Sequence, residues 1–144
     1  MPDFKRVSPS EAKDLLDAGY TYVDVRTEAE YAAGHPKGAL NVPIATSGPR
    51  GMEPNPRFAE VVEKLFAKDA KLVVGCKAGG RSLRAAEALT GAGFTSVVDQ
   101  RAGWDGARDA FGQLVEPGWS PAGLPSETTT AGADYASLLA KIGA

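Results

Sequence analysis

The sequence predicts an α/β protein whose mostly parallel sheet is flanked by helices on both faces. Two observations lead to this prediction. Apolar runs rich in β-branched residues alternate along the chain with stretches of helical periodicity, and strands that alternate with helices form parallel sheets. The length of 144 residues and the hydrophobic fraction of 43% suit one domain with its own core.

The first elements carry clear boundary signals. Ser8 opens a capping box with Pro9 at the first helical position, so we expect a helix that runs to about Ala18. Gly19 stops that helix. The residues that follow, 20–25, are mostly β-branched or aromatic and predict a buried strand.

The next part of the chain predicts shorter elements. Thr27 is placed to cap a helix over 28–33, and a turn follows at 35–38. A brief strand is expected over 39–42. Residues 43–56 contain four prolines and two glycines, so we expect a loop there.

A second alternation of helix and strand follows. Asn55 or Pro56 begins a helix whose apolar residues recur at helical spacing. The remaining elements are a strand over 71–75, a helix over 82–92 and a strand over 96–99. Ligands of such sheets bind beyond the carboxyl ends of the strands, so we look for the site there.

The character of the chain changes after the last of these strands. We expect a turn at 103–106 that leads into a short helix ending at Ala110. We predict a single domain over 1–126, including a C-terminal extension that begins at about 111. Residues 127–144 are expected to form a polar linker and a short amphipathic helix that packs on the domain or on a second copy of the chain.

Composition and charge exclude several classes of protein. The net charge is −2 with acidic and basic residues interspersed, so we expect neither a nucleic-acid nor a membrane partner. With one cysteine and one histidine the chain offers no internal disulfide and no cluster of metal ligands. We expect no metal and no cofactor. No apolar run has the length of a signal peptide or a membrane span, which predicts a cytoplasmic protein.

The single cysteine, Cys76, is placed as a nucleophile. It follows the apolar strand over 71–75 and begins the segment CKAGGRS, which continues into an alanine-rich helix. The amides of such a loop and the N-terminus of its helix point at one spot and favour a thiolate there. Lys77 and Arg81 add positive charge nearby. A buried structural cysteine would need neither the paired glycines nor the two cations.

Three motifs occur in an order and spacing that resemble those of the rhodanese sulfurtransferases. They are Asp24-Val25-Arg26, the run Gly34-His35-Pro36-Lys37-Gly38-Ala39 ahead of Asn41-Val42-Pro43, and the loop that begins at Cys76. The segment Ala102-Gly103-Trp104 is similar to a turn that this family places after its last strand. The resemblance covers roughly residues 5–110 and implies a five-stranded rhodanese-like sheet.

The resemblance implies a sulfurtransferase without a cofactor. Cys76 would take the outer sulfur of thiosulfate or another persulfide donor and pass it to a thiol or cyanide. The developing negative charge would be met by main-chain amides of the loop. The residues expected to bind the substrate are Lys77, Ala78, Gly79, Gly80, Arg81 and Ser82.

The sequence leaves two roles open for several of these residues. Lys77 binds the anionic donor or is simply solvated, and Arg81 binds the donor or braces the loop. Ser82 is expected to cap the helix, with a hydrogen bond to the persulfide as its second role. Gly79 and Gly80 are both expected to let the backbone curl close to the sulfur, so that a bulky replacement of either would tilt the amides away.

Four residues outside the loop carry further expectations. Asp24 is expected to form a structural ion pair or brace a turn, in support of the loop together with Arg26. His35 lies in a glycine- and proline-containing turn, where we expect it to hold the turn by hydrogen bonds rather than act as a base. Glu30 lies where some rhodaneses with two domains carry a substrate-binding arginine, so this chain departs from that pattern and thiosulfate is less favoured.

Other functions use similar residues. Phosphatases and arsenate reductases also place a cysteine and an arginine in an amide-lined loop, but they space them one residue further apart than Cys76 and Arg81, which four residues separate. A phosphatase also needs a general acid, and the sequence shows none near the loop. Binding modules that resemble rhodaneses typically lack the cysteine. Delivery of sulfur between a desulfurase and a biosynthetic partner protein uses the same persulfide, and the sequence does not separate it from free-standing thiosulfate chemistry.

Overall fold

The computed structural model describes residues 4–143 and is built around one parallel sheet. Its strand order is β1-β8-β7-β2-β4, and every neighbouring pair is parallel. This confirms the predicted α/β class. The five strands are β1 (Lys5–Val7), β8 (Ser96–Gln100), β7 (Lys71–Gly75), β2 (Thr21–Asp24) and β4 (Leu40–Asn41).

The edge strand β1 is an element that the sequence analysis does not predict. It pairs with β8, with Lys5 opposite Val98 and Val7 opposite Gln100. Only Val7 of its three residues is buried. Three residues are too few to show the alternation of apolar and polar side chains that marks a strand. Pairing with β8 therefore determines that this segment is extended.

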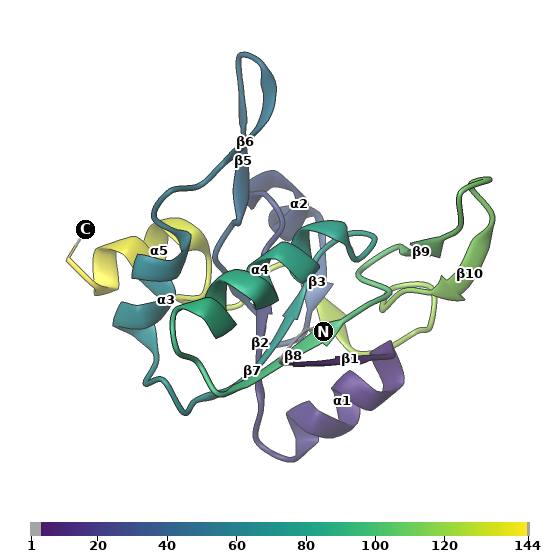
Figure 1. Cartoon of the computed structure of the whole chain (residues 1–144), viewed down its shortest axis with the longest axis horizontal. Helices are drawn as coiled ribbons and strands as arrows, with labels where there is room; N and C mark the ends of the chain where they lie inside the picture. The colour runs from purple at the N-terminus through teal and green to yellow at the C-terminus, as the bar shows by residue number, and fades with distance from the viewer. Residues whose placement is uncertain (1–3, 144) are drawn as a thin grey trace.

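Side chains of the central strands alternate between two cores, as the pleat of a strand requires. Val23 and Val74 point into the core under α3 (Phe58–Leu65), α4 (Gly80–Gly91) and α5 (Tyr135–Lys141). Their neighbours Tyr22 and Val73 point to the opposite core, which α1 (Pro9–Asp17) and Trp119 cover. Figure 1 shows α1 and α4 on opposite sides of the sheet. Helices on both faces are therefore confirmed.

Local signals account for most helix boundaries. Ser8 forms the predicted capping box at α1, and Thr27 forms another with Glu30 at α2 (Glu28–Ala33). The helix predicted to begin at Asn55 or Pro56 begins later, because Arg57 is the N-cap of α3. Asn55 instead accepts the N–H of Arg57 with its side-chain oxygen at 3.1 Å, which organises the turn before the helix.

Two hairpins replace irregular or helical segments of the prediction. The loop expected over 43–56 contains β5 (Ala45–Gly48) and β6 (Gly51–Pro54), which pair antiparallel. The short helix expected up to Ala110 is wrong.

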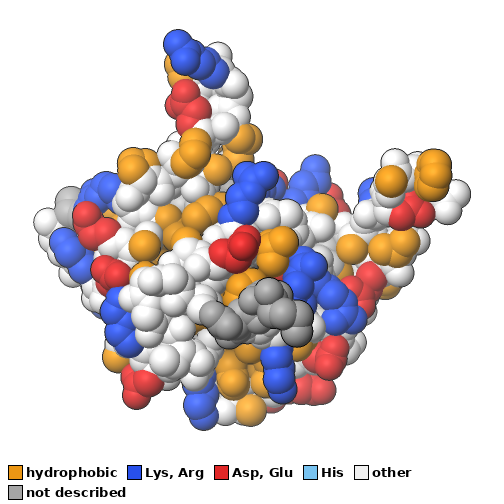
Figure 2. All heavy atoms as spheres, in the orientation of Figure 1, with side chains coloured by type: hydrophobic (Ala, Val, Ile, Leu, Met, Phe, Trp, Pro, Cys, Tyr) orange, Lys and Arg blue, Asp and Glu red, His pale blue; other side chains and the backbone are white. Residues whose placement is uncertain are grey.

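At that place β9 (Gly106–Arg108) pairs with β10 (Leu114–Pro117). The Asp109 carboxylate accepts the N–H groups of Phe111 and Gln113 and so turns the chain back. Both hairpins project from the body of the protein (Figures 1 and 2).

The polar segment that we predict as a linker makes specific contacts. Its first residue, Glu127, ends β11 (Ser126–Glu127), which pairs with β3 (His35–Pro36) in place of the simple turn expected at 35–38. The Glu127 carboxylate accepts the N–H of Gly38 at 3.0 Å. The helix α5 follows, with Tyr135 and Leu138 buried in the core. Within residues 4–143, no helix combines the length and apolar character needed to cross a bilayer.

Candidate active site

Cys76 lies at the carboxyl end of a central strand, where the sequence places the site. It follows β7 directly, and the chain then turns at Gly79 into α4. Gly79 is the N-cap of that helix, with the left-handed φ of 100°. The sulfur therefore lies beside the positive end of a helix of 12 residues.

The sulfur is held by the loop itself. Gly79 donates its N–H to Cys76 Sγ at 3.1 Å, and Ser82 Oγ lies 3.5 Å from Sγ. The cysteine is only 2% exposed. A main-chain N–H that points at a nearly buried sulfur is the arrangement expected of a loop that stabilises negative charge on that sulfur.

Ser82 does not cap the helix as predicted. The helix begins at Gly80, two residues earlier than expected, because Gly79 supplies the non-helical cap conformation. Ser82 is fully buried inside the first turn, where its hydroxyl donates to Gly79 O at 3.3 Å. That hydroxyl lies close to both the sulfur and the turn of the loop.

The two adjacent glycines have different roles. A Cβ on Gly79 would collide with the carbonyl oxygen of Arg101, and its φ is one that other residues rarely adopt. A Cβ on Gly80 would meet nothing within 4 Å. The expectation that both positions require glycine is therefore wrong for Gly80, while Gly79 is required for the close approach.

A turn after β8 braces the outer side of the loop. Trp104 donates its N–H to Cys76 O at 2.7 Å, and Asp105 donates to Lys77 O at 2.9 Å. Glycine at 103 permits this close approach, because a Cβ there would lie only 2.6 Å from Cys76 O. The segment Ala102-Gly103-Trp104 thus fixes the loop through main-chain bonds.

Gln100 organises that turn and is a residue that the sequence analysis missed. Its side-chain oxygen accepts the N–H groups of Ala102 and Gly103, both at 2.8 Å, and its nitrogen donates to Gly103 O at 2.9 Å. The side chain is fully buried. A buried glutamine needs such partners. The one available signal in the sequence was a polar residue at the end of a strand, followed by Arg101-Ala102-Gly103.

Both cations of the loop already face carboxylates. Arg81 binds Glu30 through two hydrogen bonds of 2.7 and 2.9 Å. Lys77 Nζ lies 3.7 Å from an Asp105 carboxylate oxygen, with its side chain 59% exposed. Ala78 is exposed at the tip of the loop. Arg81 therefore connects the start of α4 to α2 through its ion pair with Glu30.

Glu30 is bound from two sides. Its carboxylate accepts from Arg81 and from the N–H and hydroxyl of Thr27. Burial works against ionisation of Glu30, but the hydrogen bonds from Arg81 and Thr27 outweigh it and lower the pKa of Glu30 to about 2. The carboxylate therefore neutralises the arginine at any pH near neutrality.

Acid should weaken the fold through Glu30. Its pKa is about 2 in the folded protein, against an ordinary value of 4.5. A lowered folded pKa means that the ionised group contributes stability above the unfolded pKa and loses it as the pH falls toward the folded pKa. We expect the difference in free energy of unfolding between the wild type and Glu30→Gln to shrink from roughly pH 5 to pH 2 in urea titrations.

Glu28→Gln is the matched control, because Glu28 is an exposed acid in the same helix. Its difference from the wild type should change less over the same pH range. If the two variants showed the same pH dependence, the special contribution of the Glu30–Arg81 pair would be refuted.

Asp24 and Arg26 form a buried ion pair. Arg26 donates to the Asp24 carboxylate at 2.7 Å, and both side chains are at most 4% exposed. The guanidinium also lies over the Trp104 ring, 5.0 Å from its centre. Trp104 thus connects the pair to the cysteine loop, because its N–H binds Cys76 O. Asp24 itself lies opposite Gly75 in the sheet.

His35 is bound by Tyr31 and by the C-terminal segment. Its ring nitrogens form hydrogen bonds of 2.8 Å with Tyr31 O and with Thr130 Oγ1, and the side chain is fully buried. It also stacks on the Tyr31 ring, with centroids 3.7 Å apart. These contacts tie α2 and β3 to the C-terminal segment, which agrees with the structural role that we predict.

The fold and the loop define a class: a parallel α/β domain that presents one cysteine within an amide-lined loop at the start of a helix. The chain belongs to the rhodanese-like family, since the Rhodanese-like domain pattern matches residues 8–110.

Curated relatives agree. Thiosulfate sulfurtransferase 16, chloroplastic, from Arabidopsis thaliana is 41% identical over 121 residues, covering 84% of this chain and 91% of that protein. Thiosulfate sulfurtransferase GlpE from Pseudomonas fluorescens is 30% identical over 82% of this chain and 97% of its own length. The chain spans only 51% of the Senescence-associated protein DIN1 from Raphanus sativus, to which it is 43% identical.

Solved structures show the same architecture. The crystal structure of Rv0390 from M. tuberculosis superposes with a TM-score of 0.72 at 30% identity, covering 87% of this chain and 98% of that one. A rhodanese-related protein from Thermoplasma volcanium has a TM-score of 0.58 at 24% identity, covering 88% of this chain and 100% of that one. The latter similarity bears on the fold alone.

Proposed function

We propose that this protein is a sulfurtransferase in which Cys76 carries the transferred sulfur as a persulfide. The observation that carries the proposal is the hydrogen bond of 3.1 Å from Gly79 N–H to Cys76 Sγ at the start of α4. The names of two relatives, both thiosulfate sulfurtransferases, support the same activity.

Loading of the cysteine is a displacement at sulfur. The Cys76 thiolate attacks the outer sulfur of thiosulfate, a new S–S bond forms, and the bond to the sulfonate sulfur breaks. Sulfite leaves with the electron pair of that bond, and the negative charge of the thiolate ends on the terminal sulfur of the persulfide. Sulfite is a stable anion, so this step needs no general acid.

The main chain meets the charge of the reaction. Arg81 is paired with Glu30, and the exposed Lys77 lies 3.7 Å from Asp105, so Arg81 does not present an uncompensated cation to the donor. The amides at the start of α4 remain as preorganised donors, and one such donor is worth about 3–4 kcal/mol in comparable sites. This arrangement is compatible with thiosulfate and equally with a persulfide donor.

Unloading passes the outer sulfur from Cys76 to an acceptor. A thiolate or cyanide attacks the outer sulfur of the persulfide, and the electron pair of the S–S bond returns to Cys76 Sγ. The same chemistry applies when the acceptor thiol belongs to a partner protein, in which case the chain acts as a sulfur carrier.

Intact mass measurement tests the proposal. After incubation with thiosulfate and removal of excess donor, the protein should gain the mass of one sulfur atom, and cyanide should remove it with release of thiocyanate. Because Cys76 is the single cysteine of the sequence, the added sulfur has one thiol to occupy. Prior alkylation of the thiol should prevent the gain.

The contrary result is equally defined. A protein that gains no sulfur from thiosulfate or from a small-molecule persulfide is not a sulfurtransferase. If it instead hydrolyses p-nitrophenyl phosphate in a reaction that alkylation abolishes, the loop belongs to a phosphatase.

A further inference from the structure

Asp99 is a buried carboxylate that lies on the same face of the sheet as the cysteine. It belongs to β8 and pairs with Val74 of β7, and residues that pair across two strands point to the same face. Val74 and Cys76 both pack in the core that α4 covers. Asp99 is therefore on the α4 side of the sheet, and its side chain has no exposed surface. A carboxyl group in such a place needs a partner for each of its oxygens.

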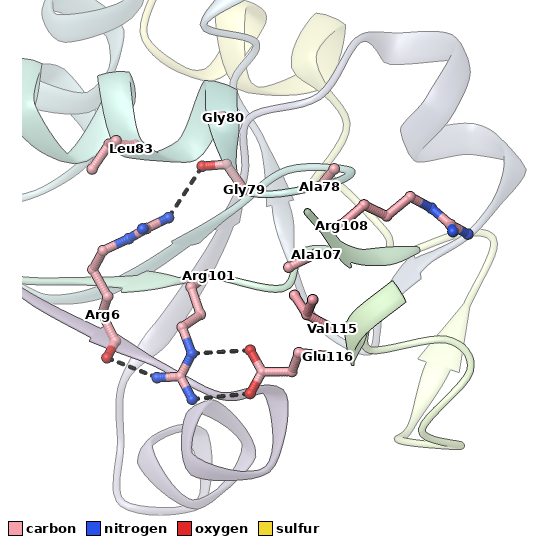
Figure 3. A pocket seen from close by; sticks show the side chains of 10 residues that line it. All are labelled: Arg6, Ala78, Gly79, Gly80, Leu83, Arg101, Ala107, Arg108, Val115 and Glu116. Atoms are coloured by element: carbon pink, nitrogen blue, oxygen red, sulfur yellow. Dashed lines mark hydrogen bonds and ion pairs between the residues drawn. The ribbon is translucent and has the colours of Figure 1, made fainter. Parts of the chain in front are cut away.

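One oxygen of Asp99 is bound and the other is not. Arg6, which lies opposite Asp99 in the sheet, donates Nε to Oδ2 at 2.7 Å. Figure 3 shows the Arg6 guanidinium directed at Gly79 O, 3.4 Å away, so this arginine also joins β1 to the start of α4. Within residues 4–143, Oδ1 of Asp99 has no hydrogen-bond partner. It is a buried acceptor that a neighbouring donor can use.

Ser82 lies between this carboxyl and the sulfur. The Cys76 thiol donates to Ser82 Oγ at 3.5 Å, and the Ser82 hydroxyl makes only a long bond of 3.3 Å, to Gly79 O. A hydroxyl has one proton to donate and can rotate toward another acceptor. Burial raises the pKa of Asp99, and the hydrogen-bonding groups of Ser82 and Arg6 offset only part of this effect. Ser82 thus connects the thiol to a carboxylate with an increased affinity for protons.

The other charged or titratable groups near the sulfur are already neutralised. Arg81 and Tyr22 both interact with the charge of the cysteine. Arg81 is paired with Glu30. Burial raises the pKa of Tyr22 far above its ordinary value, so its phenol stays neutral. Asp99 is therefore the group near the sulfur that is suited to take up a proton.

We propose that Asp99 is a positioning residue that accepts, through Ser82, the proton that Cys76 loses when it becomes a thiolate. The Cys76 proton moves to Ser82 Oγ while the Ser82 proton moves to Asp99 Oδ1. Both hydrogen bonds then reverse, so that Asp99 donates to Ser82 and Ser82 donates to the thiolate. Two protons move and no bond between heavy atoms changes, so the step needs no oxidant or reductant. The proposal rests on the function proposed above, because sulfur transfer begins from the thiolate.

The two acidic groups should titrate as a coupled pair. In the wild type the carboxyl group shares its proton with the thiol, and full ionisation brings two negative charges together, so the thiolate should form over a broad pH range. Asp99→Asn keeps the size of the side chain and an oxygen that accepts from Arg6, but it takes up no proton. Its thiolate should titrate as a single group with a lower midpoint, because the repelling carboxylate is gone.

The measurement is the rate of alkylation of Cys76 by iodoacetamide as a function of pH. The thiolate is the reactive form, and the chain has one cysteine, so the rate reports its ionisation. The rise from a tenth to nine tenths of the maximal rate should take about 2 pH units in Asp99→Asn and at least about 2.5 in the wild type. Glu87→Gln, which removes an exposed carboxylate from α4, should match the wild type in midpoint and width.

Ser82→Ala tests the connection itself. This variant keeps the carboxylate but removes the hydroxyl that joins it to the sulfur. Its curve should also narrow to about 2 pH units, but its midpoint should rise, because the thiolate loses a hydrogen-bond donor. Adding Asp99→Asn to Ser82→Ala should lower the midpoint and produce no further narrowing. If Asp99→Asn does not fold, the width of the Ser82→Ala curve decides the question by itself.

Equal widths in the wild type, Asp99→Asn and Ser82→Ala would overturn the proposal. So would a Ser82→Ala curve as broad as that of the wild type, because charge alone would then couple the two groups. Alkylation needs no sulfur donor, which separates this proposal from the proposed function. A broad wild-type curve in a protein that gains no sulfur refutes the sulfurtransferase alone, and normal sulfur loading with equal widths refutes the proton relay alone.

Discussion

Replacement of Cys76 by alanine should abolish transfer of sulfur from thiosulfate to cyanide. The reaction as proposed passes through a covalent bond to Sγ, so its loss removes the pathway rather than one stabilising contact. We expect the rate to fall by at least about 10³-fold. The measurement is release of thiocyanate under steady-state conditions.

Two comparisons make this result specific to the sulfur. Cys76→Ser keeps the size and a polar atom at the same place, but a hydroxyl is far less ionised than a thiol, so the variant should be as inactive as Cys76→Ala. Because the side chain is small, both variants should lose only about 1 kcal/mol of unfolding free energy. Substantial thiocyanate production by a folded Cys76→Ala protein would refute the proposed mechanism.

Gly79→Ala should damage both the fold and the reaction. The backbone at this position has a left-handed φ of 100°, which alanine rarely adopts, and a Cβ there would collide with the carbonyl oxygen of Arg101. The backbone must therefore move, and the N–H that it moves is the one directed at Cys76 Sγ. We expect unfolding free energy to fall by about 2–4 kcal/mol and sulfur transfer to fall by about 10²-fold.

Gly80→Ala is the matched control in the same loop. Its Cβ would meet nothing within 4 Å, and it occupies the first residue of α4. The variant should be at least as stable as the wild type, because alanine reduces the entropy of the unfolded chain without strain. Chemical denaturation and thiocyanate assays of the two variants measure both quantities. Similar behaviour of Gly79→Ala and Gly80→Ala would contradict the assigned difference between these glycines.

Local sequence signals were sufficient where short-range physics decides the outcome. The capping boxes at Ser8 and Thr27 lie within one turn of their helices, so the sequence alone located both helix starts. The apolar run over 71–75 was correctly predicted as a buried strand, and this strand places Cys76 at the carboxyl end of the sheet. These elements position the reactive residue, and they were predicted correctly.

Sequence signals failed where contacts that form only in the folded structure decide the outcome. Gln100 was overlooked because its role is to form three hydrogen bonds with the turn that follows, and the sequence alone does not show these bonds. The cap at α4 was assigned to Ser82 because serine is a common cap, whereas Gly79 adopts the required conformation under contact with Arg101. The brace between Arg81 and Glu30 joins residues 51 positions apart.

The sequence by itself determined the α/β class, the order of the main strands and of the helices that precede β8, and the single cysteine on which a sulfur-transfer function depends. Only the tertiary structure decided that the amide of Gly79 faces that sulfur and that Glu30 forms an ion pair with Arg81. The reason is physical: caps and apolar periodicity act over a few neighbouring residues, whereas charge pairing depends on which distant segments packing brings into contact.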